Sequence, residues 1–333
     1  MHRFVVNVVL LSMLRLTENH HLCAMVWRED RKGYDQFCAK HKTTLPLFFQ
    51  AGWLDQVVIQ GHWRAWVAFE SDQAVAVFVG HYRRKYGLNA LLMPQLTPYF
   101  GLWFPPMEGL DQKELTHALL STLPRVFLTS LCLTPNFEDL AAWKLNGFHH
   151  KKRTTYLIQC KTIEAYEANR SNKLQNHLKH AQAKLEIDIS SQVEELVHLV
   201  RASFEKQNRD LPYPARLVQQ IYECAAANAK ITLARDRDGV AQAGLLTVED
   251  GTTVYNLISG RKSDAIRGAQ ALLLDDAIKA AIKKGKKFDF EGSSIPDIAN
   301  FFSSFGGEVH HFYHVYRSAY RWTDALLHLI GKY

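Results

Sequence analysis

The last third of the chain alternates between helical and strand periodicity, and this order limits the possible folds more than any other feature. Residues 269–284 place Leu274, Ile278 and Ile282 on one helical face, and Gly285 ends that helix. A short strand follows over 287–291, then a helix over 296–305 and an aromatic strand over 309–317. This order predicts a sheet whose strands are connected and covered by helices.

Hairpin signals precede this unit and predict antiparallel pairing. Strands are expected over 230–235, 242–248 and 253–260, joined by turns at Asp238-Gly239 and Asp250-Gly251. In the first half, strands over 63–70 and 73–82 flank a polar turn at Ser71-Asp72. The predicted fold class is therefore α+β (mixed α/β), with mostly antiparallel sheets flanked by helices.

The two halves of the chain end in the same order of elements. A shift of 159 residues overlays Trp143 on Phe302 and Gly147 on Gly306, and in both halves an aromatic strand follows the glycine. The pattern predicts an internal duplication of architecture, although few residues are identical. We expect domains over 25–160 and 185–320, joined by a basic linker helix over 161–184 and followed by a tail helix over 321–333.

Composition is that of an ordinary globular protein with a positive net charge. The chain has 333 residues, of which 47% are hydrophobic and 22% charged, and a net charge of +7. That surplus favours anionic partners such as nucleotides, coenzyme A or tRNA. The five cysteines lack ligand spacing, so we expect reduced thiols in a cytoplasmic protein. Adjacent histidines on a strand face opposite sides, so no metal site is expected.

Residues 4–16 are apolar but too few to span a bilayer, so no membrane span is expected. The segment resembles a signal-peptide core, but 17–22 lacks a small-residue cleavage site. We favour a translation start at Met25, which makes 1–24 an N-terminal extension: a start-site artefact or a docked strand.

The helix that begins near residue 269 follows a loop suited to an anion. Arg261, Lys262 and Arg267 surround it, and Gly268 and Ala269 are small. Unpaired N–H groups at a helix start bind pyrophosphate well. The alternative is an ordinary N-terminus capped by the Ser263-Asp264 pair.

The order of elements in the second half resembles the GNAT N-acyltransferase fold. The resemblance rests on residues 256–317, where the strand FDFEGS is followed by a helix and then SFGGE. In the first half AGWLDQVV, NFEDLAAW and GFHHKKRTTYLI also fit the tandem GNAT proteins, which include the Fem-type peptidyltransferases. The resemblance covers roughly residues 26–320 and implies two GNAT-like domains.

The resemblance implies that an acyl-CoA donor lies between two separating strands and that its pyrophosphate binds at the next helix start. On this chain the donor site falls on the following residues: Leu257, Ile258, Ser259, Arg261, Arg267, Gly268, Ala269 and Gln270. Anchored on Gly268, the usual acyl-CoA motif is broken at two positions, by Ala265 and Gln270.

Acyl transfer from a thioester needs an oriented amine and a group that accepts its proton. Asp289 and Glu291 share one face of the expected strand, and two close carboxylates raise one pKa, which suits a general base. The alternative is a pair that binds a cation structurally. Tyr255 is the candidate acid. The expected acceptor contacts are Asn256, Tyr316, and Tyr99 and Trp103 of the aromatic loop 94–106, which lines an apolar cleft or packs over the core.

Three functions fit these features. The first is an N-acyltransferase that moves an acyl group from coenzyme A to an amine bound between the domains. The second is a Fem-type transferase using aminoacyl-tRNA, favoured by Lys173, Lys179 and Lys184 on a basic helix, although these lysines also fit a solvated face. The third is a binding protein that kept the fold without the chemistry.

Overall fold

The computed structural model describes residues 25–319 except 86, 108, 136, 138, 293 and 294. The expectations for 1–24 and for a tail helix over 321–333 lie outside the described residues. Within the described part, no helix is long and apolar enough to cross a membrane.

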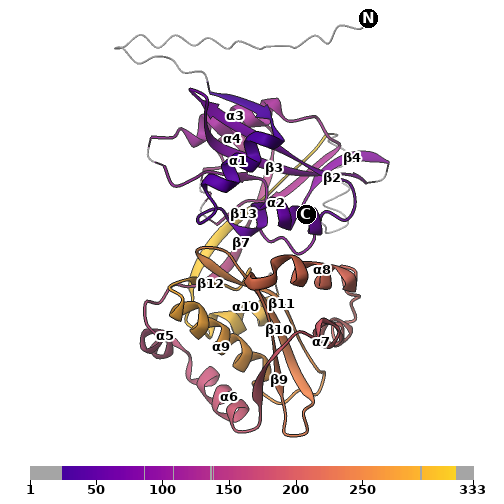
Figure 1. Cartoon of the computed structure of the whole chain (residues 1–333), viewed down its shortest axis with the longest axis vertical. Coiled ribbons are helices and arrows are strands. Elements are labelled where there is room, and N and C mark those ends of the chain that lie inside the picture. Colours follow the sequence, from indigo (N-terminus) through magenta and orange to yellow (C-terminus); the bar gives the residue numbers. More distant parts are fainter. Residues whose placement is uncertain are drawn as a thin grey trace, which may run out of the picture.

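The first half forms the upper part of the molecule in Figure 1. Its elements are β1 (Val26–Glu29), α1 (Arg31–Lys40), α2 (Ala51–Val57), β2 (His62–Glu70), β3 (Gln73–Lys85), β4 (Leu88–Leu92), β5 (Leu102–Trp103), α3 (Gln112–Thr122), β6 (Leu128–Cys132), α4 (Ala141–Leu145) and β7 (His149–Ile158). The predicted β2–β3 hairpin is confirmed, and Ser71 and Asp72 both adopt positive φ, as its two-residue turn requires.

The second half forms the lower part. Its elements are α5 (Ile163–Asn169), α6 (Asn172–Gln182), β8 (Glu186–Ser190), α7 (Val193–Glu205), α8 (Ala215–Ala225), β9 (Ala229–Arg235), β10 (Ala241–Glu249), β11 (Thr253–Arg261), α9 (Ala269–Lys283), β12 (Lys287–Asp289), α10 (Pro296–Ser303) and β13 (Glu308–Ser318). The predicted meander of three strands and the helix that follows it are confirmed.

One sheet runs through both halves. Its strand order is β1-β2-β3-β4-β6-β13-β7-β12-β11-β10-β9-β8, with β5 paired beside β3. The pairs β4–β6 and β11–β12 are parallel, and the other pairs are antiparallel. This arrangement confirms the predicted fold class, and the matching parallel pairs repeat the same architecture in each half.

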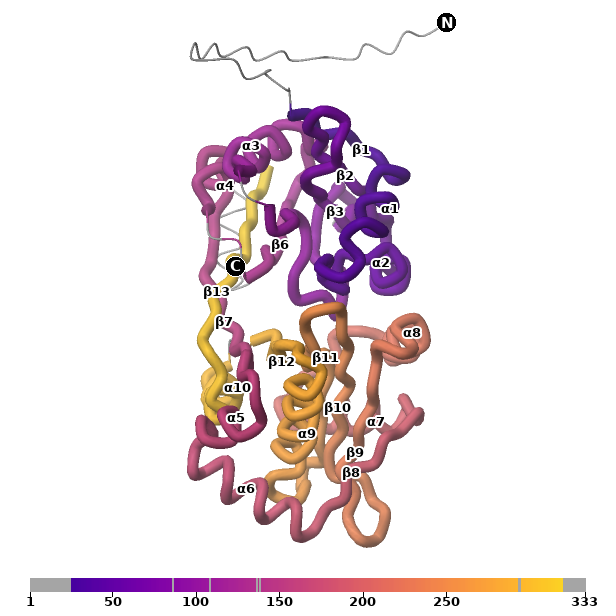
Figure 2. Tube along the Cα trace, turned by 60° about the vertical axis from the view of Figure 1, so that its left-hand side comes forward, coloured from indigo at the N-terminus to yellow at the C-terminus, as the bar shows by residue number. Residues whose placement is uncertain are grey.

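The last strand of each half crosses to the other half. β13 pairs with β6 of the first half through His314–Ser318, whereas β7 reaches β12 of the second half through Leu157 and Ile158. β7 and β13 run side by side between the two parts of the molecule (Figure 2). The proposed domains, 25–160 and 185–320, therefore share the middle of one sheet.

Helices cover both faces of the sheet in the second half. Along β10, Leu245 packs in the cluster that contains α9, and Leu246 packs in the cluster that contains α7. Because neighbouring residues of a strand face opposite sides, α7 and α9 lie on opposite faces. The cluster with α7 continues into the first half through Phe48, so apolar packing spans the junction.

Asp250, in the turn between β10 and β11, connects the second half to the first. Its Oδ2 accepts hydrogen bonds from the Leu47 backbone at 3.2 Å and the Tyr255 hydroxyl at 2.8 Å. Its Oδ1 accepts from the backbone N–H groups of Thr252 and Thr253 at 2.8 and 2.9 Å. A buried carboxylate with this many donors holds the turn against the first half.

Replacing Asp250 by alanine should therefore lower the free energy of unfolding by roughly 3 kcal/mol, because several charge-assisted hydrogen bonds are lost and buried donors are left unpaired. Urea unfolding followed by circular dichroism measures the change. Asp238→Ala, in the exposed turn between β9 and β10, is the matched control and should stay within about 0.5 kcal/mol. Equal losses for the two variants would contradict the role assigned to Asp250.

Candidate functional site

β11 and β12 separate after a short stretch of pairing. They pair only over Thr253–Tyr255 and Lys287–Asp289, while β11 continues to Arg261. From Asn256 onward, the edge of β11 that faces β12 has no strand partner among the described residues. An extended ligand can add to such an edge through backbone hydrogen bonds.

A bulge in β11 marks the point of separation. In the pairing with β10, Leu246 is opposite Ile258 and Thr247 is opposite Asn256, so Leu257 is the extra residue. Bulges re-aim the side chains around them. Here Asn256, Leu257 and Ser259 line a cavity, whereas Ile258 packs into the core.

The cavity has a volume of about 440 Å³ and draws residues from both halves. Its walls are formed by Pro94, Leu96, Thr97 and Pro98 of the first half, Asn256, Leu257 and Ser259 of β11, Phe290, Glu291 and Gly292 after β12, and Ile298 and Phe302 of α10. It therefore lies where the two strands separate and where the two halves meet.

The strand expected over 287–291 is shorter than predicted. β12 ends at Asp289, and Glu291 adopts a left-handed conformation with a φ of 59°. The Glu291 N–H turns back to donate to Asp289 Oδ1 at 2.7 Å. The prediction that Asp289 and Glu291 share one strand face is wrong, because the chain no longer has strand geometry at Glu291.

Asp289 is 2% exposed and fully engaged. Its Oδ2 accepts from the Tyr99 hydroxyl at 2.9 Å, and its Oδ1 accepts from Thr155 Oγ1 at 2.6 Å as well as from Glu291. Burial raises the pKa of Asp289, although these donors oppose the shift. Asp289 thus ties β7 and the first-half loop to the turn that carries Glu291.

Glu291 is the carboxyl residue among the described residues that line the cavity. Its Oε1 atom is buried and has no hydrogen-bond partner within the described part of the chain, and the same holds for Oδ1 of Asn256. Burial, and then the charge of Asp289, raise the pKa of Glu291 well above its usual range. A group with raised pKa beside a cavity is a candidate proton acceptor.

Sequence reasoning did not consider the loop between α7 and α8, which carries Tyr213. Burial, and then the charge of Glu291, raise the pKa of this tyrosine. The same loop contacts the first half, because Gln95 Nε2 donates to the Pro212 carbonyl at 3.2 Å. The only sequence signal was an aromatic residue in a proline-rich loop, NRDLPYP.

Tyr255, Tyr316 and Trp103 are not among the described residues that line the cavity. The Tyr255 hydroxyl is committed to Asp250, and its ring packs on Phe48 at 4.7 Å between centroids. Trp103 packs against Phe37 of the first half. Tyr316 lies in the part of β13 that pairs with β6.

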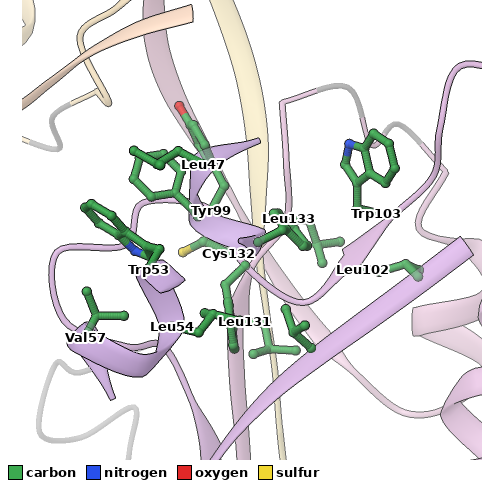
Figure 3. Packing of buried hydrophobic residues seen from close by; sticks show 14 of the residues in the cluster. Leu47, Trp53, Leu54, Val57, Tyr99, Leu102, Trp103, Leu131, Cys132 and Leu133 are labelled. Atoms are coloured by element: carbon green, nitrogen blue, oxygen red, sulfur yellow. The ribbon is translucent and has the colours of Figure 1, made fainter. Parts of the chain in front are cut away.

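The aromatic loop 94–106 fulfils both of its expected roles. Its first residues line the cavity, while Phe100 and Leu102 are fully buried. Leu102 belongs to β5, which pairs with β3, and it lies in the apolar cluster that also holds Leu131 and Leu133 (Figure 3). The Phe100 N–H donates to the Cys132 carbonyl at 2.7 Å, just beyond the paired part of β4 and β6. The loop thus fills the slot of the first half that corresponds to the open slot beside β11.

The start of α9 carries the predicted anion-binding residues. Gly268 is its N-cap with a φ of 90°, so the alternative of a cap at Ser263 or Asp264 is wrong. A Cβ at Gly268 would overlap the His177 carbonyl of α6, which explains the glycine. Arg267 Nη2 lies 2.8 Å from His177 Nε2, and the pKa of His177 is lowered by burial and then by that guanidinium.

The remaining donor-site residues are divided between core and surface. Ala269 is buried under α6, whereas Arg261 is exposed at the end of β11. The Gln270 side-chain nitrogen is buried without a partner. Within the described residues, no group of three or more His, Cys, Asp or Glu is placed to hold a metal ion.

A Glu291→Gln variant should be more stable than the wild type at pH 8 and equally stable near pH 4. The folded pKa is raised, so the wild type loses stability as pH rises above about 4.3, the pKa of an unfolded glutamate. The glutamine variant lacks this loss. Urea unfolding at both pH values measures the free energy of unfolding of the variant and of the wild type. A difference between the two proteins that is the same at both pH values would refute the prediction. Glu308→Gln, at an exposed position, is the control.

Comparison with known proteins agrees with this architecture. Residues 168–294 match the family model of the acetyltransferase (GNAT) domain. No curated protein sequence matches the chain significantly. Among solved structures, FemX has a TM-score of 0.67 at 12% identity, covering 92% of this chain and all of that chain.

Two further structures share the fold over nearly their whole length. L-PGS from Bacillus licheniformis has a TM-score of 0.54 at 13% identity, covering 92% of this chain and 98% of that chain. A tandem GNAT protein from the clavulanic acid biosynthesis pathway has a TM-score of 0.52 at 11% identity, covering 89% and 99%. The chain therefore has the tandem GNAT fold, and its residues 168–294 are similar to the acetyltransferase (GNAT) domain.

Proposed function

We propose that the chain is an N-acyltransferase that uses an acyl-CoA donor and an amine acceptor. The observation that supports this most directly is the separation of β11 from β12 at the Leu257 bulge, next to a cavity bordered by Glu291. The separated strands offer unpaired backbone to an extended donor, and the cavity offers room for an acceptor. Both reactants can then be held at one point, which supplies much of the rate of a group transfer.

The donor fits the open edge of β11. Its pantetheine arm would pair with the backbone of Leu257–Ser259, and its pyrophosphate would lie at the start of α9. The N–H groups and dipole of a helix start attract phosphate, and Arg267 adds a positive charge beside them. The exposed Arg261 lies on the way between these two points. Acyl-CoA acts here as a co-substrate.

The acceptor enters the cavity, where Glu291 takes its proton. The amine nitrogen then attacks the thioester carbonyl, an amide bond forms, the carbon–sulfur bond breaks, and the thiolate leaves with a proton from the site. Asp289 is a positioning residue, since its hydrogen bonds hold the Glu291 turn. Because the Tyr255 hydroxyl is committed to Asp250, the proton that Glu291 takes from the amine is the candidate proton for the thiolate.

Glu291→Gln should lower kcat for transfer from acetyl-CoA to an amine by about 100-fold or more, because a general base contributes that much. The affinity for acetyl-CoA should be retained, since the donor binds β11 and α9. The measurement combines a free-thiol assay over an amine panel with calorimetric titration of acetyl-CoA. Glu308→Gln should leave both values unchanged. A protein that binds no acyl-CoA would fit the non-catalytic alternative and refute the proposal.

A second candidate function is a Fem-type transfer from aminoacyl-tRNA. The supporting observation is the set of exposed basic side chains on α6 and at the start of α9. Lys173 lies one helical turn before His177, which contacts Arg267, and Lys179 is exposed on the same helix. Lys184 follows just beyond α6 and is also exposed. Burial, and then the charges of Arg267, Lys173 and His180, lower the pKa of His177. Phosphate groups bind such clusters by releasing counterions.

If tRNA is the donor, the double variant Lys173→Gln/Lys179→Gln should bind tRNA more weakly. The slope of log affinity against log salt concentration should become shallower by about 1.8, because each of the two lost phosphate contacts contributes about 0.9. Filter binding at several salt concentrations measures it. Lys113→Gln/Lys144→Gln removes the same charge from exposed positions of the first half and is the control. Identical slopes for both double variants would rule out a tRNA site on α6.

A further inference from the structure

The cavity between the two halves is unusual in its charge. Among the described residues that line it, Glu291 is the only ionisable side chain, and none is Lys, Arg or His. The side chain of Asp289 accepts from the Glu291 backbone, so two carboxyl groups share this end of the cavity. The chain as a whole carries a net charge of +7, so the composition of this cavity departs from that of the molecule.

Two side chains that line the cavity each hold a buried acceptor oxygen without a partner among the described residues. They are Oε1 of Glu291 and Oδ1 of Asn256, which belong to opposite sides of the separation between β11 and β12. Leaving such atoms unpaired costs free energy, and a rotation of either side chain that lets it accept from a ligand N–H group regains part of that cost. A protonated amine supplies several donors and a positive charge together.

The rest of the lining is largely apolar. Phe290 and Phe302 stack with their ring centroids 4.6 Å apart, and Leu257 and Ile298 continue that wall. The first half contributes Pro94, Leu96 and Pro98. Thr97 of this loop accepts a hydrogen bond from Trp53 Nε1 at 3.2 Å and donates to the Gln95 carbonyl at 3.0 Å, so its hydroxyl is engaged. The body of the ligand therefore meets hydrocarbon.

We infer that the acceptor is a cationic amine with an apolar body and no carboxylate beside its amino group. A carboxylate in this cavity would be desolvated, would find no cation in the lining and would face Glu291, so an amino acid is disfavoured relative to its decarboxylated amine. An alcohol of the same shape would lose the charge pairing with Glu291. The chemistry of the ligand is inferred from the cavity, and only its role as acyl acceptor rests on the proposed transferase function.

The test compares three ligands that share a phenethyl group: phenethylamine, 2-phenylethanol, and phenylalanine, which adds a carboxylate beside the amine. Isothermal titration of the full chain without donor should show phenethylamine binding at least about tenfold more tightly than either of the others. Tryptamine and tryptophan form a second pair with the same expected order. Glu291→Gln should weaken binding of the two amines about tenfold, and Glu308→Gln should leave it unchanged.

The inference is overturned if the amino acids or the alcohol bind as tightly as the amines, if neither amine binds, or if the glutamine at 291 has no effect. Binding and turnover separate its failure from that of the proposed function. Amine binding without transfer from any acyl-CoA would sink the function and leave the inference standing. Preferential acylation of amino acids would sustain the function and overturn the inference.

Discussion

The candidate site depends on one constraint: two parallel strands are paired at their starts and then forced apart. The extra residue at Leu257 turns β11 away, and the left-handed backbone at Glu291 ends β12. The bulge in β11 alone would not open the sheet, because a longer β12 could still pair with a bulged strand. The cavity, the free strand edge and the orientation of Glu291 all follow from this separation.

Non-local contacts keep the separation in place. Asp289 gathers donors from the first-half loop, from β7 and from the Glu291 backbone, so three distant segments meet at one carboxylate. Asp250 does the same at the start of β11. These acids are saturated with hydrogen bonds, whereas Glu291 and Asn256, which line the cavity, each keep a buried oxygen without a partner in the described part of the chain. The buried acids that hold the fold together are therefore not the residues proposed to bind a ligand. This holds even for Asp289 and Glu291, which are only two residues apart.

Local signals in the sequence were sufficient for most elements. Aspartate–glycine turns fixed the meander, and helical spacing located α9 within a residue or two. The position of the donor slot came from the family resemblance. Glu291 was selected as part of a strand, but its left-handed φ is held by Asp289 and by Gly292, which packs closely on the Thr154 carbonyl. Tyr213 and the crossing of β7 and β13 depend on contacts between residues far apart in sequence, which no periodicity reports.

The two halves repeat one architecture and differ in what fills the slot. In the first half, Phe100 occupies the space beyond the β4–β6 pair and bonds to Cys132, so that slot is part of the core. The segment that closes it belongs to the same loop that continues into the wall of the second cavity through Pro94–Pro98. Closure of one slot therefore positions a wall of the other. A rigid wall also limits the rearrangement that binding requires, and this preorganisation lowers the entropic cost of holding an acceptor against the donor.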